Sequence, residues 1–397
     1  MMPFKPADRV SSLKPYFFAT LSKKINQLLA ANVDVIRIDI GSPDLPPAEF
    51  IIKTLCSETK RSDTHRYSPY GGTPAFRQAV ALYYKNRFNV DLDPATEVVG
   101  LIGSKEGLFN LSQILLDPGD LVLVTNPGYP VYKASAAIAG AEVYMLPLLS
   151  ENDFLPNLDA IPGEVAEKAK LMWLNYPNNP TGAVASLAFF EKAVDFARKH
   201  HILIAHDAPY VDICFDGYIA PSMLQVPGAK DVVLEFNSLS KAYNMAGWRL
   251  GMAVGNPQIT QLLHTYKTQI DTSHFAPILS AGVAALTGDQ TWLEERNRIY
   301  QQRRDIVVKT LKKLGFGLNT PPAAIYIWAH LPEQFPDDFA FCSALLDESG
   351  ISITPGSVYG EYGSGYIRIS LGTKTEKIEE AMQRLTQWFQ QKGKSTP

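Results

Sequence analysis

The lysine at position 241 has the surroundings of a nucleophilic amine. It lies in Ser238-Leu239-Ser240-Lys241, just after the apolar run 232–236, and such a run predicts a buried strand that delivers Lys241 to the carboxyl edge of a parallel sheet. An amine whose pKa is lowered by burial or by nearby cations forms Schiff bases with carbonyl groups. Arg249 follows in the same segment and offers a cation for a phosphate. A solvated surface lysine is the ordinary alternative, and other motifs decide between the two.

Asp207 follows a second apolar run, 202–205, in His206-Asp207-Ala208-Pro209-Tyr210. The run predicts a central parallel strand, which places Asp207 where open α/β sheets bind ligands. A carboxylate there can keep the ring nitrogen of pyridoxal phosphate (PLP) protonated, so that the ring accepts electrons. Capping of a following helix is an equally good use of an aspartate at this place.

Two further segments predict turns at strand ends. Residues 175–182, with two prolines, two asparagines and a glycine after the apolar run 171–174, indicate a rigid turn, and a ligand contact by Asn179 stays open. Gly103-Ser104-Lys105 precedes the apolar-periodic segment 108–115. A helix that begins there offers free N–H groups to a phosphate, although serine is also an ordinary helix cap.

These four segments, in this order and approximate spacing, resemble the class I/II aminotransferases, which are PLP enzymes of fold type I. The resemblance extends from about Ile36 to the last predicted helix. Within this family, the pattern of residues is similar to that of the branch of aspartate, alanine and LL-diaminopimelate aminotransferases. The resemblance implies the fold class: a PLP-dependent transferase fold of type I, with a mainly parallel α/β sheet of the seven-stranded type between helices and a smaller α+β domain.

The resemblance also implies roles for the residues named so far. Lys241 forms the Schiff base with PLP and then moves the proton between the substrate carbon and the cofactor. Asp207 holds the ring nitrogen. Tyr210 and Asn179 contact the phenolate oxygen of the cofactor, which tunes the pKa of the Schiff base.

The same resemblance implies which residues contact the phosphate of PLP and which residue lies against the face of its ring. Ser104, Lys105, Ser238 and Arg249 surround the phosphate. Tyr129, in Asn126-Pro127-Gly128-Tyr129-Pro130, stacks on the ring, with a loop aromatic that covers the core as the alternative.

The substrate contacts come from both ends of the chain. Arg368 lies in the alternating segment 366–371, and its planar guanidinium suits the α-carboxylate of an amino acid. Gly41 corresponds to a small residue whose backbone closes on that carboxylate, although a plain turn glycine explains it nearly as well. Tyr67 matches a tyrosine that reaches the phosphate from a second subunit, which implies a homodimer with shared sites.

Composition favours a cytoplasmic enzyme. The chain has 397 residues and a net charge of −3, so it exceeds a single core and has no overall attraction to nucleic acid or to anionic membranes. We expect no signal peptide, no membrane helix and no zinc-ligand spacing. Cys56, Cys214 and Cys342 are scattered, which indicates reduced, buried thiols.

The order of predicted elements indicates two domains. Helix and strand patterns alternate up to residue 288, with strands at 35–40, 121–124 and 142–146 and a helix at 187–200, which is typical of a parallel sheet covered on both faces. Helical segments at 291–314 and 374–391 and strands at 324–328, 351–354 and 366–371 then follow. We predict an N-terminal arm with part of the small domain at 1–46, the PLP domain at 47–288 and the rest of the small domain at 289–397.

The predicted function is transamination between an L-amino acid and a 2-oxo acid such as 2-oxoglutarate. An acidic donor such as aspartate or LL-diaminopimelate is favoured, because Lys105 is a candidate for a distal carboxylate. Lys105 serves equally well as added charge beside the phosphate. An alanine-type aminotransferase or a PLP β-lyase uses the same cofactor residues, and a regulator domain of this fold without activity is the remote alternative.

Overall fold

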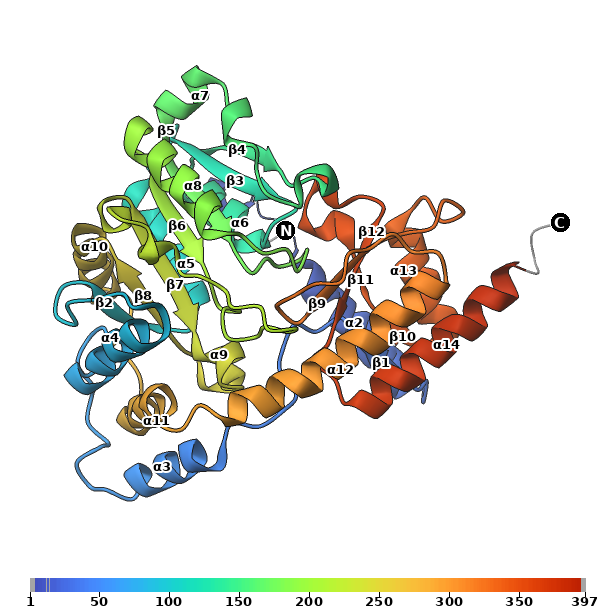
Figure 1. Cartoon of the computed structure of the whole chain (residues 1–397), viewed down its shortest axis with the longest axis horizontal. Coiled ribbons are helices and arrows are strands. Elements are labelled where there is room, and N and C mark those ends of the chain that lie inside the picture. The colour runs from blue at the N-terminus through green and yellow to red at the C-terminus, as the bar shows by residue number, and fades with distance from the viewer. Residues whose placement is uncertain (1–3, 12, 14, 394–397) are drawn as a thin grey trace.

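A seven-stranded sheet forms the centre of the larger part of the molecule (Figure 1). The computed structural model describes residues 4–11, 13 and 15–393. Strand β8 is antiparallel to both of its neighbours, and the other strands of this sheet are parallel. In spatial order the strands are β2 (Val98–Ile102), β8 (Leu250–Gly255), β7 (Val233–Ser238), β6 (Leu203–Asp207), β5 (Ala169–Asn175), β3 (Leu121–Asn126) and β4 (Glu142–Pro147).

Helices cover both faces of this sheet, as the apolar strands require. In β5, Leu171 and Trp173 belong to one core cluster, while Met172 and Leu174 belong to the other, because successive side chains of a strand point to opposite faces. The first cluster is completed by α5 (Ser104–Leu115), α6 (Pro130–Ala139) and α10 (Pro257–Lys267). The second is completed by α4 (Pro74–Phe88), α8 (Leu187–His200) and α11 (Ala276–Thr287), with α3 (Glu49–Thr59) packed on α11.

Helix α8 shows how local sequence defines an element. Ser186 caps its start by accepting a hydrogen bond from the N–H of Phe189 at 3.2 Å, and its buried apolar residues recur at helical spacing as Phe190, Ala193, Val194 and Ala197. The helix ends at His200, and the next residue, His201, adopts a left-handed conformation with φ of 56°. The predicted range 187–200 is therefore confirmed, because cap, periodicity and stop agree.

The smaller part of the fold has its own apolar core. It is joined to the larger part by α12 (Trp292–Lys313), a long helix that runs beside α14 (Thr375–Gly393) (Figure 1). Strands β11 (Thr354–Pro355), β12 (Tyr366–Ser370) and β9 (Tyr326–His330) form an antiparallel sheet, and β1 (Ile36–Arg37) pairs in parallel with β10 (Ile351–Ser352). Helices α2 (Phe17–Ala30) and α13 (Asp338–Ser349) complete this part, and α1 (Asp8–Ser11), α7 (Gly163–Lys168) and α9 (Leu239–Ala242) are short.

The fold class predicted from the sequence is confirmed, while several strands of the smaller part differ from their predicted ranges. The segment 35–40 forms only the short β1, because Ile38 donates its N–H to Ser352 and accepts from the N–H of Ser370, so the chain crosses from one small sheet to the other. For the same reason 351–354 is divided between two sheets, and the strand expected at 324–328 begins at Tyr326. The division at residues 46 and 288 stays a prediction.

Other expectations concern the surface and the thiols. The prediction of buried thiols is wrong for Cys56, which is exposed on α3, and Cys214 is half-buried, whereas Cys342 is buried. Within residues 4–11, 13 and 15–393, no helix has both the length and the apolar character needed to span a membrane. In that same part of the chain no group of three or more His, Cys, Asp or Glu residues is arranged to hold a metal ion.

Candidate active site

A cavity of about 390 Å³ lies at the carboxyl ends of β5, β6 and β7. These strands end in Asn175, Asp207 and Ser238, so the sheet itself brings three polar side chains to one edge. All but one of the residues proposed from the sequence line the cavity: Gly41, Ser104, Lys105, Tyr129, Asn179, Asp207, Tyr210, Ser238, Lys241, Arg249 and Arg368. The exception is Tyr67.

Lys241 has the environment of a reactive amine. It belongs to the short helix α9, which follows β7 directly, and its Nζ donates a hydrogen bond to the carbonyl oxygen of Gly41. Burial, with added repulsion from Arg368 and Arg249, lowers the pKa of Lys241 to about 8. A large fraction of the amine is therefore neutral and nucleophilic in mildly alkaline solution.

Asp207 is buried at the bottom of the cavity. Its Oδ2 accepts a hydrogen bond from Tyr132 Oη at 2.7 Å, while its Oδ1 is buried without a hydrogen-bond partner. Burial raises the pKa of Asp207 to about 6, although the hydrogen bond from Tyr132 and the charge of His206 act in the opposite direction. The helix-cap alternative is wrong, because the chain continues from Asp207 into a turn rather than a helix.

Tyr132 is a site residue that sequence reasoning missed. It is fully buried on α6 and stacks on Trp173, with ring centroids 4.8 Å apart. The available signal was its place three residues after Tyr129, the N-cap residue of α6, but that spacing does not reveal the contact with Asp207.

One corner of the cavity is suited to a dianion. Helix α5 begins at Ser104, so its unpaired N–H groups face this corner, and Arg249 lies beside it. Gly103 has φ of 70°, which favours glycine, and a Cβ at this position would displace the guanidinium of Arg249. Ser238 caps α9 by accepting from the N–H of Ser240 at 3.2 Å. Ser240, which sequence reasoning missed, also lines the cavity.

Arg368 is a buried cation that also lines the cavity. Its Nη1 donates to Asn179 Oδ1 at 3.0 Å and its Nη2 to the carbonyl of Asp39 at 2.7 Å, while its Nε is buried without a partner. Its guanidinium lies 4.3 Å from the centroid of the Tyr326 ring. The alternative of a solvent-facing strand arginine is wrong, since Arg368 is 3% exposed.

Tyr326 connects two predicted residues. Its hydroxyl lies 2.8 Å from the hydroxyl of Tyr210, and a Cβ on Gly41 would collide with it. Gly41 is therefore needed for space and not for a left-handed turn. Tyr326 itself was not proposed, because its position inside an apolar strand is typical of a core residue.

The N-terminal segment closes one side of the cavity through Tyr16 and Phe18. Lys105 Nζ lies 5.0 Å from the ring centroid of Tyr16 and 5.9 Å from that of Tyr129. Burial and the nearby Arg249 lower the pKa of Lys105. The run of aromatic residues at 16–18 was the only sequence signal for this wall.

Tyr67 lies outside the cavity. It is 89% exposed, in a loop that also carries the exposed Tyr70. Ile270 and Phe275 are exposed as well, and the ring of Phe275 lies 5.5 Å from that of His65. The chain by itself does not bring Tyr67 to the other predicted residues.

Comparison with known proteins agrees with this geometry. The family model described as aminotransferase class I and II matches residues 33–385, and the chain belongs to this family. It is therefore an aminotransferase, and the members of its family use PLP.

The similar proteins cover nearly the whole chain. An LL-diaminopimelate aminotransferase of Moorella thermoacetica is 49% identical over 379 residues, which are 96% of this chain and 97% of the relative. One of Dehalococcoides mccartyi is 48% identical over 96% of this chain and 98% of the relative. Among solved structures, substrate-bound BacF of Bacillus subtilis has a TM-score of 0.93 at 38% identity, with 98% of each chain covered.

Proposed function

We propose that this aminotransferase uses PLP to exchange the amino group of LL-diaminopimelate with 2-oxoglutarate. The observation that carries the proposal is the 46–49% identity, over nearly their whole lengths, to several proteins named LL-diaminopimelate aminotransferase. The pocket is chemically compatible with such a donor, because Lys105 lines the same cavity as Arg368 and offers a second cation. A donor with a second carboxylate needs a second cation.

The residues of the cavity fit PLP. The unpaired Oδ1 of Asp207 suits a protonated ring nitrogen, and the N-terminus of α5 with Arg249 suits the phosphate. Ser104, Ser238 and Arg249 would hold the phosphate, Tyr129 the ring face, and Tyr210 with Asn179 the phenolate oxygen, while Lys105 is assigned to the distal carboxylate of the donor. When bound, PLP supplies a carbonyl that condenses with amines and a ring that accepts electrons from the bond being broken.

The remaining steps depend on residues of the chain. Arg368 would bind the α-carboxylate, where its unpaired Nε and its planar shape give a two-point grip. Lys241, released by the incoming amine, would take the proton from the α-carbon of the donor and deliver it to the cofactor. In the second half-reaction the same groups act in reverse on the 2-oxo acid. Gly41, whose carbonyl accepts from Lys241, would hold the lysine on the correct side.

A panel of donors tests the proposed substrate. We expect LL-diaminopimelate to convert the enzyme from its Schiff-base absorbance to the aminated form faster than aspartate, glutamate or alanine at equal concentration. Rates are read by stopped-flow absorbance, followed by return of the band with 2-oxoglutarate. Faster conversion by aspartate or alanine than by LL-diaminopimelate would refute the substrate assignment and leave the aminotransferase class unchanged.

A substitution at Lys105 tests the distal contact. We expect Lys105→Met to raise KM for LL-diaminopimelate about tenfold, or about 1.4 kcal/mol, with little change for alanine, because a uniform binding contact is lost for one class of donor only. Lys133→Met, which removes an exposed lysine outside the cavity lining, is the matched control. An equal loss for acidic and neutral donors would assign Lys105 to the phosphate instead.

We further propose that the enzyme is a homodimer in which Tyr67 reaches the phosphate of the partner's site. The exposed Tyr67 and Tyr70, with Ile270 and Phe275, support this proposal, since exposed apolar side chains of this size favour burial at an interface. A symmetric pair would complete two sites.

Complementation tests the shared site. Tyr67→Ala and Lys241→Ala are each expected to be nearly inactive alone. Subunit exchange between them should recover up to about a quarter of wild-type activity, because half of the dimers are mixed and each mixed dimer has one intact site. Mass spectrometry of differently tagged chains confirms the exchange. No recovery despite exchange would mean that Tyr67 does not act in the partner's site.

A further inference from the structure

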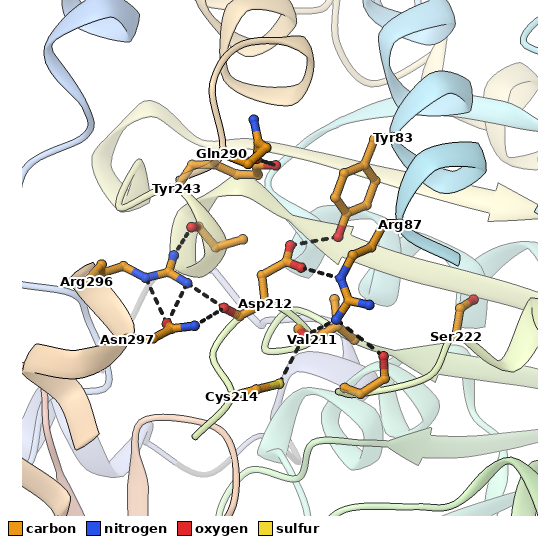
Figure 2. Close-up of polar contacts among 12 residues, drawn as sticks. Tyr83, Arg87, Val211, Asp212, Cys214, Ser222, Tyr243, Gln290, Arg296 and Asn297 are labelled. Carbon is orange, nitrogen blue, oxygen red and sulfur yellow. Dashed lines mark hydrogen bonds and ion pairs between the residues drawn. The ribbon is translucent and has the colours of Figure 1, made fainter. Parts of the chain in front are cut away.

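A buried arginine outside the cavity contacts the end of α9, the short helix that carries Lys241. Figure 2 shows this arginine, Arg296, with its polar contacts. Arg296 projects from α12 and is 2% exposed. Its Nη1 donates to the carbonyl oxygen of Ala242, and its Nη2 donates to that of Asp212 at 2.5 Å. Ala242 follows Lys241 directly, and Asp212 lies two residues beyond Tyr210. One guanidinium therefore joins the two chain segments that carry the reacting groups.

The turn with Lys241 needs such a donor. Helix α9 has only four residues, Leu239–Ala242, and the last carbonyls of a helix have no partner inside it. A cation at the helix end satisfies a carbonyl and interacts favourably with the helix dipole. A second contact comes from the segment before α12, since Tyr243 Oη donates to Gln290 Oε1 at 2.9 Å.

The segment after Tyr210 is held from two sides. The carboxylate of Asp212 accepts from Tyr83 Oη at 2.7 Å and from Arg87 Nε at 3.0 Å, both on α4. Its backbone carbonyl accepts from Arg296 and also from Asn297 Nδ2 at 3.0 Å. Figure 2 shows Asp212 between α4 and α12, so its position relative to both helices is strongly constrained.

The orientation of the Arg296 guanidinium is also determined. Asn297 Oδ1 accepts from its Nη2 at 2.8 Å and from its Nε at 3.2 Å. The direct hydrogen-bond acceptors of this guanidinium are two backbone carbonyls and one side-chain amide, and the charge of Asp212 offsets part of the cost of its burial. Its hydrogen bonds to the backbone therefore converge beside two active-site residues.

We propose that Arg296 is a positioning residue for transamination, which sets the distance between the Lys241 turn and the Tyr210 segment through the carbonyls of Ala242 and Asp212. This inference rests on the proposed roles of Lys241 and Tyr210. Lysine can replace the planar fork only in part, because a single ammonium keeps the charge and can reach one carbonyl but does not hold two diverging carbonyls in a fixed plane. A displacement of either segment of about 1 Å would slow the proton transfer while leaving the substrate cation Arg368 in place.

The test compares Arg296→Met with Arg304→Met in the holoenzyme. Arg304 is the matched control, because it is also a buried arginine of α12, with 3% of its surface exposed. It pairs with Asp216 and donates a hydrogen bond to the carbonyl of Pro321 at 3.2 Å. We expect kcat of Arg296→Met to fall about 10- to 100-fold with KM within about threefold, and Arg304→Met to retain kcat. Hydrogen exchange should accelerate in peptides that cover 208–214 and 239–245 only in the Arg296 variant. The pH titration of the Schiff-base band should also shift in the Arg296→Met variant. Arg296→Lys should restore part of kcat.

Several outcomes separate the explanations. Equal kcat, exchange and titration in the two methionine variants would overturn the inference and reduce Arg296 to an anchor of α12. If Arg296→Met does not fold, Arg296→Lys and Asn297→Leu are judged by the same criteria against Arg304→Met. Lys241→Ala is assayed beside them. If Lys241→Ala is inactive while the Arg296 variants keep a normal kcat, this inference alone is overturned. If Lys241→Ala is active, the proposed role of Lys241 is overturned, and the inference loses its premise.

Discussion

Lys241→Ala is expected to lower kcat by about 10⁴-fold, or about 5 kcal/mol in the barrier, because it removes both the amine that binds the cofactor carbonyl and the base that moves the proton. PLP should remain bound after desalting, since the phosphate corner at Ser104 and Arg249 and the carboxylate of Asp207 are intact. The visible spectrum should lose the Schiff-base band and show the free aldehyde. A variant that keeps the band after exhaustive dialysis would assign the Schiff base to another lysine.

The pH dependence of PLP uptake by the wild-type apoenzyme tests whether the lowered pKa of Lys241 governs its reactivity. Because the pKa of Lys241 is lowered to about 8, the neutral amine forms as pH rises through this value. The rate of Schiff-base formation by the apoenzyme should therefore increase from pH 7 to 9 and then level off. An increase that continues to about pH 10.5, the ordinary range of a lysine, would show that the burial of Lys241 has little effect on its reactivity.

Asp207→Asn is expected to reduce kcat by about 10²- to 10³-fold, or about 3–4 kcal/mol, with a much smaller loss of PLP affinity. The amide keeps the shape of the side chain and still accepts from Tyr132, but it removes the charge that holds the ring nitrogen protonated. Single-turnover absorbance with a saturating donor measures this loss. Activity equal to the wild type would mean that Asp207 does not act on the cofactor.

The same substitution should stabilise the apoenzyme. Burial raises the pKa of Asp207 from 3.8 to about 6, so between these values the folded state keeps a proton that the unfolded state has lost. Stability then falls as pH rises from about 4 to 6, and the full penalty of about 3 kcal/mol remains above pH 6. Urea unfolding of apo Asp207→Asn should show a gain over the wild type that grows across this window and is constant above it. A gain that does not depend on pH would contradict the raised pKa.

Much of the large sheet and of its ligand edge was predictable from the sequence. The runs before Asp207 and Lys241 are short, apolar and rich in branched residues, and such runs in an alternating α/β pattern are buried parallel strands whose carboxyl ends carry ligand residues. The start of α5 at Ser104, directly after the left-handed Gly103, and the range of α8, with its Ser186 cap and apolar periodicity, were likewise determined locally. The lining of one cavity by Asp207, Lys241 and Arg249 follows from that order.

Other features depend on contacts between residues that are far apart in the chain. Tyr132 meets Asp207, Gly41 meets Lys241 and Tyr326, and Arg296 meets Ala242. No local pattern predicts these pairs, because a buried tyrosine or a glycine has the same local signature whether it packs in the core or touches a reacting group. The length of β1 was overestimated and β10 and β11 were merged for a related reason, since their pairing is determined by neighbours from distant segments.

The sequence by itself determined the class of the protein: it places a lysine, an aspartate and an arginine after strands in the order typical of one family of PLP enzymes, and strand order with local chemistry is sufficient for that. Only the tertiary structure decided the state of these groups. Burial and partners across the fold lower the pKa of Lys241 and raise that of Asp207, whose Oδ1 is left unpaired. They also provide the two backbone carbonyls to which Arg296 donates. Desolvation and long-range hydrogen bonds depend on three-dimensional packing, which residue spacing along the chain does not contain.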